Sequence, residues 1–311
     1  MAEPFRRRIR EKLLRFASAS SVVLPQPVVL GGLQSAAWFS RFSAFEETTR
    51  SNLRLAYNDE LSEDELQDIA SGVRRHLARL SYEWLQLGAI GDERDTWLSA
   101  RVQVDDSLEI LQREIAKGRG AIVVTAHIGN WELLAATLAR VGFKGSVVGL
   151  EKRKDPSAAW LIKMRKSYKV ETIPQHSSPR ALVRVLQEGQ VLGLLCDLEV
   201  RRLGGEFLPF FGTQALTMTA PAALARTRGL PLIPVRCVLP REGASAYRLI
   251  VSEPLRYNHS LPRKQAMLGL MTELNAVYEE WIRESPMQWA WHQKRWRTRP
   301  GELVATPLAG R

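Results

Sequence analysis

Cysteine is scarce in this chain of 311 residues, which has only Cys196 and Cys237 and no CxxC pair. This scarcity argues against a disulfide framework and against a cysteine-based zinc site, and it favours a reducing compartment. Internal repeats and low-complexity segments are also lacking. With 45% hydrophobic residues, the chain still has enough apolar side chains to bury a substantial core.

Long apolar runs are missing as well. A membrane-spanning helix needs roughly 18 or more consecutive apolar residues, and no segment supplies them. Residues 22–39 come nearest, but Pro25, Pro27, Gly31 and Gly32 interrupt them. The arginines near the N-terminus are not followed by an apolar stretch and a small-residue cleavage site, so no signal peptide is predicted.

Acidic residues are outnumbered by basic ones, 33 to 44, which gives a net charge of +11. Such a balance indicates an anionic partner: nucleic acid, a membrane surface or an acidic substrate. Near the N-terminus, Phe5, Ile9, Leu13 and Phe16 recur at helical spacing among arginines. This pattern predicts a basic amphipathic helix that lies on an anionic bilayer, or alternatively a solvated helix docked on the protein. Without a recognisable nucleic-acid-binding module, nucleic acid is not expected as the partner.

Two patterns divide the chain. The first 100 residues predict mostly helices, one of them with Ser62 as N-cap and Glu65 three residues later. From about 115 to 290, short β-branched runs alternate with helical segments, which predicts an α/β domain whose sheet is covered by helices on both faces. We divide the chain into an N-terminal membrane-associating segment, residues 1–45, and a main domain, residues 46–311.

The stretch "VVTAHIGNWELL", residues 123–134, holds a candidate catalytic pair. His127 follows a predicted strand, and Asn130 is a plausible N-cap that puts Glu132 in the first turn of the next helix. On one helix, residues five apart share no face, but a turn between strand and helix brings them together. Glu132 would then orient His127, which would take a proton from a hydroxyl group. The alternative is an ordinary connection between strand and helix without a catalytic role, since acidic residues are common in the first turns of helices.

Other catalytic signatures are missing from the sequence. It contains no GxSxG elbow, HExxH pair, Walker loop or glycine-rich dinucleotide fingerprint after a strand. A serine hydrolase or a nucleotide-binding enzyme would therefore need an unrecognised arrangement.

Four stretches in order resemble the bacterial late acyltransferases of lipid A biosynthesis, which carry an H-x4-D/E motif. They are "HIGNWE" at 127–132, "LCDLE" at 195–199, "FLPFFG" at 207–212 and "MQWAWHQKRWRTRP" at 287–300. The resemblance covers roughly residues 50–300 and extends to the phosphatidylinositol mannoside acyltransferases. It implies a mixed, mostly parallel sheet sandwiched by helices. It also implies transfer of a fatty acyl group from acyl carrier protein or coenzyme A to a hydroxyl of a membrane glycolipid, at the cytoplasmic face of the bacterial inner membrane.

The resemblance also assigns residues. His127 would be the general base and Glu132 its partner, and the resemblance implies neither a metal nor an organic cofactor. The expected substrate-binding residues are Glu151, Arg165, Asp197, Glu199, Arg202, Phe210, Phe211 and Gly212. For Asp197, a salt bridge to a neighbouring arginine is the alternative, and for the phenylalanines, ordinary core packing.

Two features depart from the family pattern. Its lipid A members usually have an N-terminal transmembrane helix, and we expect the basic helix and the tryptophans Trp289, Trp291 and Trp296 to attach the chain to the membrane instead. These tryptophans are also compatible with packing of the last helix on the sheet. The segment "EKRKDP", 151–156, resembles the mannoside acyltransferases, so the acceptor is left open between a lipid A precursor and another glycolipid.

Overall fold

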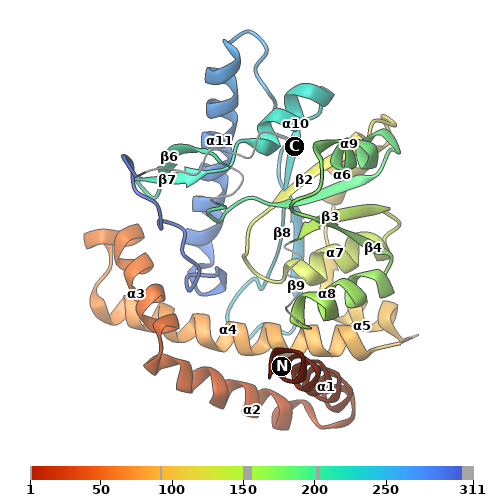
Figure 1. The fold of residues 1–311 in the computed structure, drawn as a ribbon, viewed down its shortest axis with the longest axis vertical. Coiled ribbons are helices and arrows are strands. Elements are labelled where there is room, and N and C mark those ends of the chain that lie inside the picture. The colour runs from red at the N-terminus through yellow and green to blue at the C-terminus, as the bar shows by residue number, and fades with distance from the viewer. Residues whose placement is uncertain (1, 92, 150–155, 201–203, 303–311) are drawn as a thin grey trace.

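The fold is an α/β sandwich with a helical N-terminal region (Figure 1). The computed structural model describes residues 2–91, 93–149, 156–200 and 204–302. The helices are α1 (Ala2–Val23), α2 (Gln26–Phe39), α3 (Ala44–Tyr57), α4 (Glu63–Ala89), α5 (Arg94–Arg101), α6 (Leu108–Ile115), α7 (Trp131–Arg140), α8 (Pro156–Ser167), α9 (Pro179–Gln187), α10 (Ala220–Arg228) and α11 (Arg263–Glu284). The strands are β1 (Val102–Val104), β2 (Ala121–Thr125), β3 (Gly145–Gly149), β4 (Val170–Pro174), β5 (Val191–Leu195), β6 (Glu206–Phe210), β7 (Thr213–Thr217), β8 (Leu232–Val238) and β9 (Tyr247–Val251).

Seven strands form the main sheet in the order β1-β9-β8-β2-β5-β3-β4. Every neighbouring pair is parallel except β8 and β9, so the predicted mixed, mostly parallel sheet is confirmed. The central strand β2 is buried along its whole length. Its side chains alternate between two cores: Ile122 and Val124 pack with α11, and Val123 packs with α7. Helices therefore cover both faces, as the alternating sequence pattern predicts.

A separate hairpin, β6–β7, holds the "FLPFFG" stretch. Phe210 pairs with Thr213, which leaves Phe211 and Gly212 as a two-residue loop. Both loop residues have positive φ, +52° and +67°. Such two-residue loops match the right-handed twist of the strands they join.

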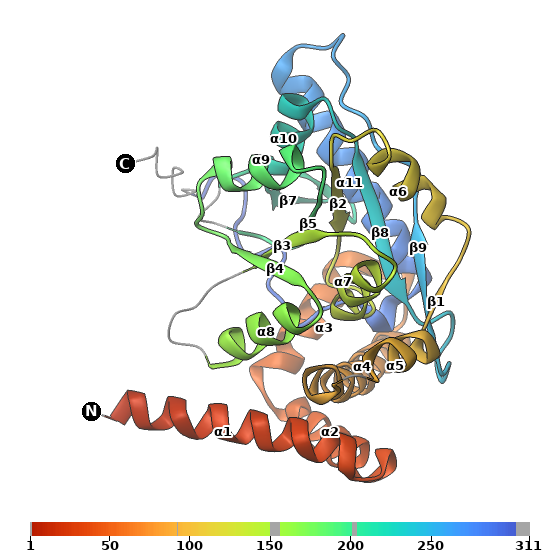
Figure 2. The same ribbon diagram turned by 90° about the vertical axis from the view of Figure 1, so that its right-hand side faces the viewer.

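The N-terminal helices lie on the outside of the domain. Ser62 and Glu65 form the expected capping box at the start of α4. Helix α1 packs against α4 and α8, and α2 packs against α4. Figure 2 shows α1 and α2 as an outer layer beneath α4. Helix α1 ends before Pro25, and a new helix, α2, follows. Gly31 and Gly32 interrupt the apolar run in the sequence, but α2 continues through both.

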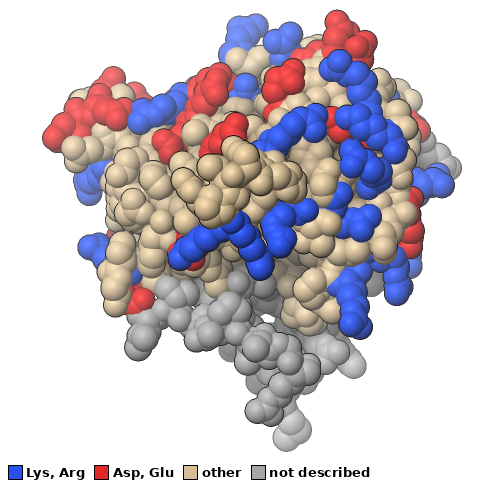
Figure 3. All heavy atoms as spheres, turned by 90° about the horizontal axis from the view of Figure 1, so that it is seen from above, with Lys and Arg blue, Asp and Glu red and all other residues tan. Residues whose placement is uncertain are grey.

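In the described part of the chain, no helix is long and apolar enough to cross a membrane. Several large apolar side chains are nevertheless exposed on α1, on α2 and just after α2. They are Leu13, Phe16, Val22, Val23, Leu24, Val28, Trp38, Phe39 and Phe42. On the opposite face, acidic and basic side chains are interspersed (Figure 3). The apolar exposure is thus concentrated on the outer N-terminal layer.

Candidate active site

The site is built where β2 and β5 end. These strands are parallel neighbours, and Thr125 at the end of β2 stands opposite Leu195 at the end of β5. His127 and Asp197 each follow two residues later. The register therefore brings a histidine and an aspartate side by side at the carboxyl edge of the sheet, where ligands bind in open α/β folds.

Asp197 is the hydrogen-bond partner of His127. Its Oδ1 lies 2.8 Å from Nδ1 of the His127 ring, and its Oδ2 accepts from the His127 backbone N–H at 2.8 Å. Oδ2 also accepts from Nε1 of Trp289 at 2.8 Å. Asp197 is fully buried, whereas the His127 side chain is 27% exposed. One ring nitrogen is thus bonded to a buried carboxylate, while part of the side chain is exposed.

The charge state of Asp197 determines the histidine tautomer. Burial acts to raise the pKa of this carboxyl, but the charge and hydrogen bonds of His127 and the bond from Trp289 outweigh it and hold the pKa below its usual value. An ionised carboxylate only accepts hydrogen bonds, so Nδ1 must carry the proton. When the ring is neutral, Nε2 has its lone pair free, which is the state a general base requires.

Glu132 has different partners, and the expected contact between Glu132 and His127 is wrong. Both carboxylate oxygens of Glu132 accept from Arg165, at 2.5 Å from Nη2 and 3.0 Å from Nε. The Tyr168 hydroxyl donates to Oε2 at 3.1 Å. The first turn of α7 directs this side chain toward α8, and the bidentate guanidinium satisfies the buried carboxylate. Whether Glu132 takes part in catalysis stays a prediction.

The turn between His127 and α7 requires its glycine. Gly129 has φ +59°, and a Cβ there would collide with the Cys237 carbonyl. Its N–H donates to the Gln288 carbonyl at 3.0 Å, and its own carbonyl lies 3.1 Å from Nε2 of His76. Two segments far apart in sequence therefore hold the rear of the turn. This close packing fixes the position of the His127 backbone.

Asn130 is the N-cap of α7, as predicted, because its side chain accepts from the Leu133 N–H at 3.1 Å. The same oxygen accepts from Nε1 of Trp84 at 3.0 Å, and its amide donates to Glu83 at 2.8 Å. Trp131 lies edge-on to the His127 ring, with 5.0 Å between centroids. The cap thus bonds α4 to the turn that follows His127. Trp84 packs edge-on against Trp131, which in turn contacts the His127 ring.

A second histidine, His292, lies near His127. Its ring stacks on Phe45 at 4.7 Å, and Asn52 holds the chain on either side of it by donating to the carbonyls of Trp291 and Gln293. Burial, followed by the nearby charge of His127, lowers the His292 pKa to about 4. A neutral imidazole is therefore held close to the proposed base.

The remaining predicted residues have varied positions. Glu199 accepts from the backbone N–H groups of Arg297 and Thr298 and from the Thr298 hydroxyl, so it holds the C-terminal segment. Phe210 and Phe211 are buried and contact Trp289, Trp291 and Trp296. Their role toward a substrate, like that of Gly212, stays a prediction. Glu151 and Arg202 lie outside the described residues.

Two tryptophans occupy unexpected surroundings. Trp289 and Trp291 are essentially fully buried, so their expected place at a membrane surface is wrong, and their packing against the sheet is right. Trp289, a partner of Asp197, was not expected in the site, nor were Trp84 and Trp131. The alternation of strands in the sequence places Asp197 at a strand end, but no sequence pattern states which strands are neighbours.

Both cysteines are buried. Burial raises the pKa of both Cys196 and Cys237 above the ordinary thiol range, which disfavours a thiolate nucleophile. Across the residues that the structure describes, no cluster of histidine, cysteine and carboxylate side chains is arranged to hold a metal ion.

Comparison with known proteins gives a consistent result. Residues 13–298 match the family described as bacterial lipid A biosynthesis acyltransferase. The lipid A biosynthesis palmitoleoyltransferase of Escherichia coli is 24% identical over 296 residues, which covers 90% of this chain and 88% of that protein. The lauroyltransferase of the same organism is 26% identical over 189 residues, 60% of this chain and 58% of the relative. A phosphatidylinositol mannoside acyltransferase of Mycobacterium tuberculosis is 29% identical over 141 residues, 43% of this chain and 44% of the relative.

Proposed function

Because the chain belongs to the bacterial lipid A biosynthesis acyltransferases, we propose that it transfers a fatty acyl chain to a hydroxyl of a membrane glycolipid, most simply a lipid A precursor. The donor would be a thioester of acyl carrier protein or coenzyme A. The reaction would take place at the cytoplasmic face of the bacterial inner membrane.

The observation that carries this proposal is the His127–Asp197 pair, in which Asp197 is buried and part of the His127 side chain is exposed. Nε2 takes the proton of the acceptor hydroxyl as its oxygen attacks the thioester carbonyl carbon. The C–S bond then breaks, and the departing thiolate receives the proton from the imidazolium. Asp197 stabilises the cation that forms between these two steps. The same pair would serve either thioester donor.

Glu132 and Arg165 would form the charged part of the substrate pocket. The bidentate contact fixes the guanidinium beside Glu132 in the first turn of α7, the helix that begins shortly after His127 in the sequence. A guanidinium held in this way suits an anionic group on a substrate, such as a phosphate. We therefore propose that Glu132 positions Arg165, and that Arg165 contacts the substrate.

Membrane attachment would use the outer N-terminal layer. Phe16, Val23, Phe39 and Phe42 have between 65% and 81% of their surface exposed, which is unusual for side chains of this kind. Arg41 lies 4.9 Å from the ring centroids of both Trp38 and Phe42. Apolar side chains with an interleaved cation suit the headgroup region of an anionic bilayer. This layer replaces the buried tryptophans as the proposed anchor.

A second candidate acceptor is a phosphatidylinositol mannoside. The local match to a mannoside acyltransferase has the higher identity, although it covers less than half of the chain. The same histidine, carboxylate and thioester would serve this acceptor. The two candidates differ only in the glycolipid that is acylated.

Mass spectrometry of glycolipids distinguishes these possibilities. Deletion of the gene should remove one acyl chain from a single glycolipid class, whose headgroup identifies the acceptor. The wild-type gene should restore it, and His127→Ala should not, because no base remains. His259→Ala, which removes an exposed histidine elsewhere, is the matched control and should restore it fully. Full restoration by His127→Ala would contradict the mechanism.

The donor is tested with purified protein. Acyl carrier protein and coenzyme A carrying the same acyl chain are compared for kcat/KM on the acceptor so identified. A preference of tenfold or more for one thioester, abolished along with activity by His127→Ala, would identify the donor.

A further inference from the structure

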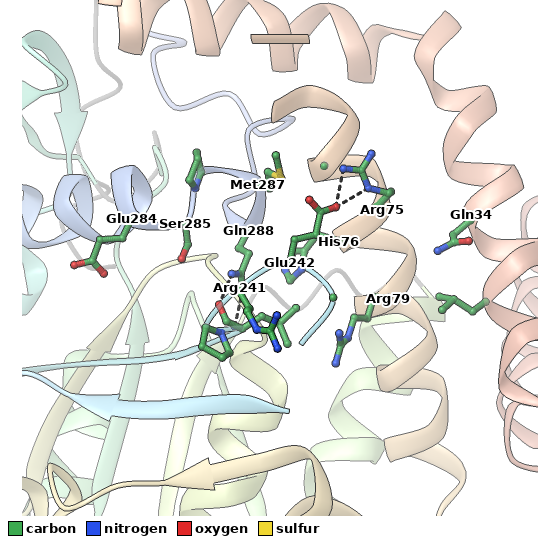
Figure 4. A pocket seen from close by; sticks show the side chains of 16 residues that line it. Gln34, Arg75, His76, Arg79, Arg241, Glu242, Glu284, Ser285, Met287 and Gln288 are labelled. Carbon is green, nitrogen blue, oxygen red and sulfur yellow. Dashed lines mark hydrogen bonds and ion pairs between the residues drawn. The ribbon is translucent and has the colours of Figure 1, made fainter. Parts of the chain in front are cut away.

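A pocket of about 380 Å³ lies next to the turn that follows His127, because two of its lining residues bond to Gly129 in that turn. Helices α2 and α4, the loop after β8 and the end of α11 enclose it (Figure 4). His76 and Gln288 line it, and both bond to the backbone of Gly129. His76 contacts the Gly129 carbonyl, and the Gln288 carbonyl accepts from the Gly129 N–H. The pocket and the catalytic site thus share one turn, but His127 is not among the residues that line the pocket.

The lining combines cationic and apolar side chains. The cationic lining residues, here called the rim, are Arg75, Arg79 and Arg241, and the acidic ones are Glu242 and Glu284. The apolar lining residues, here called the floor, are Leu30, Leu239, Pro240, Pro286 and Met287. A ligand that fits both parts is an amphiphile with an anionic head.

The three arginines differ in how far they are neutralised. Arg75 donates to Glu242 at 2.7 Å, and Arg79 donates to Glu83 at 2.8 Å and to the Ala244 carbonyl. Arg241 is exposed and makes no ion pair or side-chain hydrogen bond within the described residues. It is the cation at this rim that is available to an incoming anion.

The outer wall shows where such a ligand would come from. Helix α2 contributes Leu30 and Gln34, and Figure 4 shows Gln34 directed from α2 toward the space beside Arg79. The remainder of α2 exposes Val28, Trp38 and Phe39 to solvent. A helix with this exposure suits the interfacial region of a bilayer, and in that position the pocket would be at the level of the lipid headgroups.

We propose that this pocket binds an anionic phospholipid from the membrane. Its phosphate contacts Arg241 together with Arg75 or Arg79, and the first carbons of an acyl chain lie on the apolar floor. The proposal rests on contact of α2 with a membrane and is independent of the acyl-transfer chemistry. Because the bound lipid touches His76 and Gln288, it contacts the residues that support the catalytic turn.

The test measures binding of lipids that are monomeric in water. Phosphatidylglycerol and phosphatidylcholine with the same short acyl chains are titrated into the full-length protein by calorimetry, with inorganic phosphate as a third probe. We expect phosphatidylglycerol to bind at least tenfold more tightly than either of the others. Phosphatidylcholine lacks the net negative charge, and inorganic phosphate lacks the apolar part.

Two variants place the binding in this pocket. Arg241→Ala removes the available cation from an exposed loop and should weaken phosphatidylglycerol binding about tenfold or more. Leu30→Trp fills the pocket from α2 and should reduce binding by a similar factor. The matched control is Arg180→Ala, an exposed arginine on α9, which should leave binding unchanged.

Three results would overturn the proposal. Equal affinity for phosphatidylcholine would remove the role of charge. Equal affinity for inorganic phosphate would make the pocket a phosphate site, not a lipid site. Unchanged phosphatidylglycerol binding in Arg241→Ala would place the lipid elsewhere, and this variant keeps the test valid even if Leu30→Trp fails to fold.

Discussion

Asp197 and Glu132 are two carboxylates that are equally buried and have different hydrogen-bond partners. Their exposed fractions are 0% and 1%. Asp197 accepts from the ring and backbone of His127 and from Trp289, whereas Glu132 accepts from Arg165 and Tyr168. Asp197 lies 70 positions from the histidine and is bonded to it, while Glu132, five residues away in the sequence, is bonded elsewhere.

The difference in partners gives the difference in chemistry. A histidine gains and loses a proton within the physiological range, so the carboxylate bonded to it can support a proton transfer. An arginine is permanently charged, so the carboxylate bonded to it fixes a cation in place. Burial acts to lower the Arg165 pKa, but Glu132 and Tyr168 outweigh it and raise that pKa further. In the proposed mechanism, Asp197 therefore supports the proton transfer and Glu132 fixes the position of a cation.

The largest expected effect comes from Asp197→Asn. The amide keeps the shape of the side chain but removes the ionised acceptor that selects the Nδ1–H tautomer. We expect kcat to fall by about 10²- to 10⁴-fold, as such changes do in other histidine–aspartate pairs. Steady-state rates on the identified acceptor measure the fall, and circular dichroism checks that the variant is folded. A kcat within threefold of wild type would contradict the assignment.

The second effect concerns the Glu132–Arg165 pair, and it should appear mainly in stability. Glu132→Gln leaves the Arg165 guanidinium without its carboxylate in a mostly buried place. Loss of one partner from a buried pair costs about 3–5 kcal/mol. Chemical denaturation measures the free energy of unfolding, and the loss of kcat should be smaller than in Asp197→Asn.

A double variant separates this pair from general damage. Arg165→Met in the Glu132→Gln background removes the unpaired charge. The free energies of the two single variants and the double variant should then be non-additive by about 1–3 kcal/mol. Additive losses would show that the two residues act independently and would remove the basis for a positioning role.

A third effect concerns His76, which holds the turn through a carbonyl and not a carboxylate. Burial is the main cause that lowers its pKa to about 4, from an ordinary value of 6.5. The unfolded chain gains a proton below pH 6.5, whereas the folded protein gains it only near pH 4. The contribution of neutral His76 to the free energy of unfolding is therefore complete above pH 6.5. It falls by about 3 kcal/mol in total between pH 6.5 and pH 4.

The measurement is urea denaturation at several pH values between 7 and 4. His76→Gln should have a shallower loss of stability across this range, because glutamine does not titrate. Part of the slope should persist, since the His292 pKa is also lowered to about 4. His259→Gln, on the surface, is the control. An identical slope in wild type and His76→Gln would show that His76 is not held neutral.

Much of the fold follows from the sequence. The apolar runs give β2, β3, β4, β5, β8 and β9, and cap residues such as Ser62 and Asn130 mark where α4 and α7 begin. Strand β1 has three residues, and the hairpin β6–β7 consists of short segments around a turn; both lack a clear periodicity and were not predicted.

The candidate site could be predicted only in part. Each strand end supplies a polar residue, so His127 and Asp197 are both visible as candidates. Their pairing depends on which strands are neighbours and in what register, and β2 lies beside β5 only through a long-range crossover. Proximity in sequence suggested Glu132 as the partner, but the first turn of α7 directs that side chain to Arg165.

The measurement that tests the central claim most directly is the tautomer of His127. Nitrogen-15 NMR of protein with labelled histidine, assigned by comparison with His127→Gln, shows which ring nitrogen carries the proton at neutral pH. We expect a proton on Nδ1 and a free Nε2 in the wild type. This tautomer should be altered in Asp197→Asn and retained in Glu132→Gln. A proton on Nε2 in the wild type, or a tautomer that changes in Glu132→Gln and not in Asp197→Asn, would contradict this expectation.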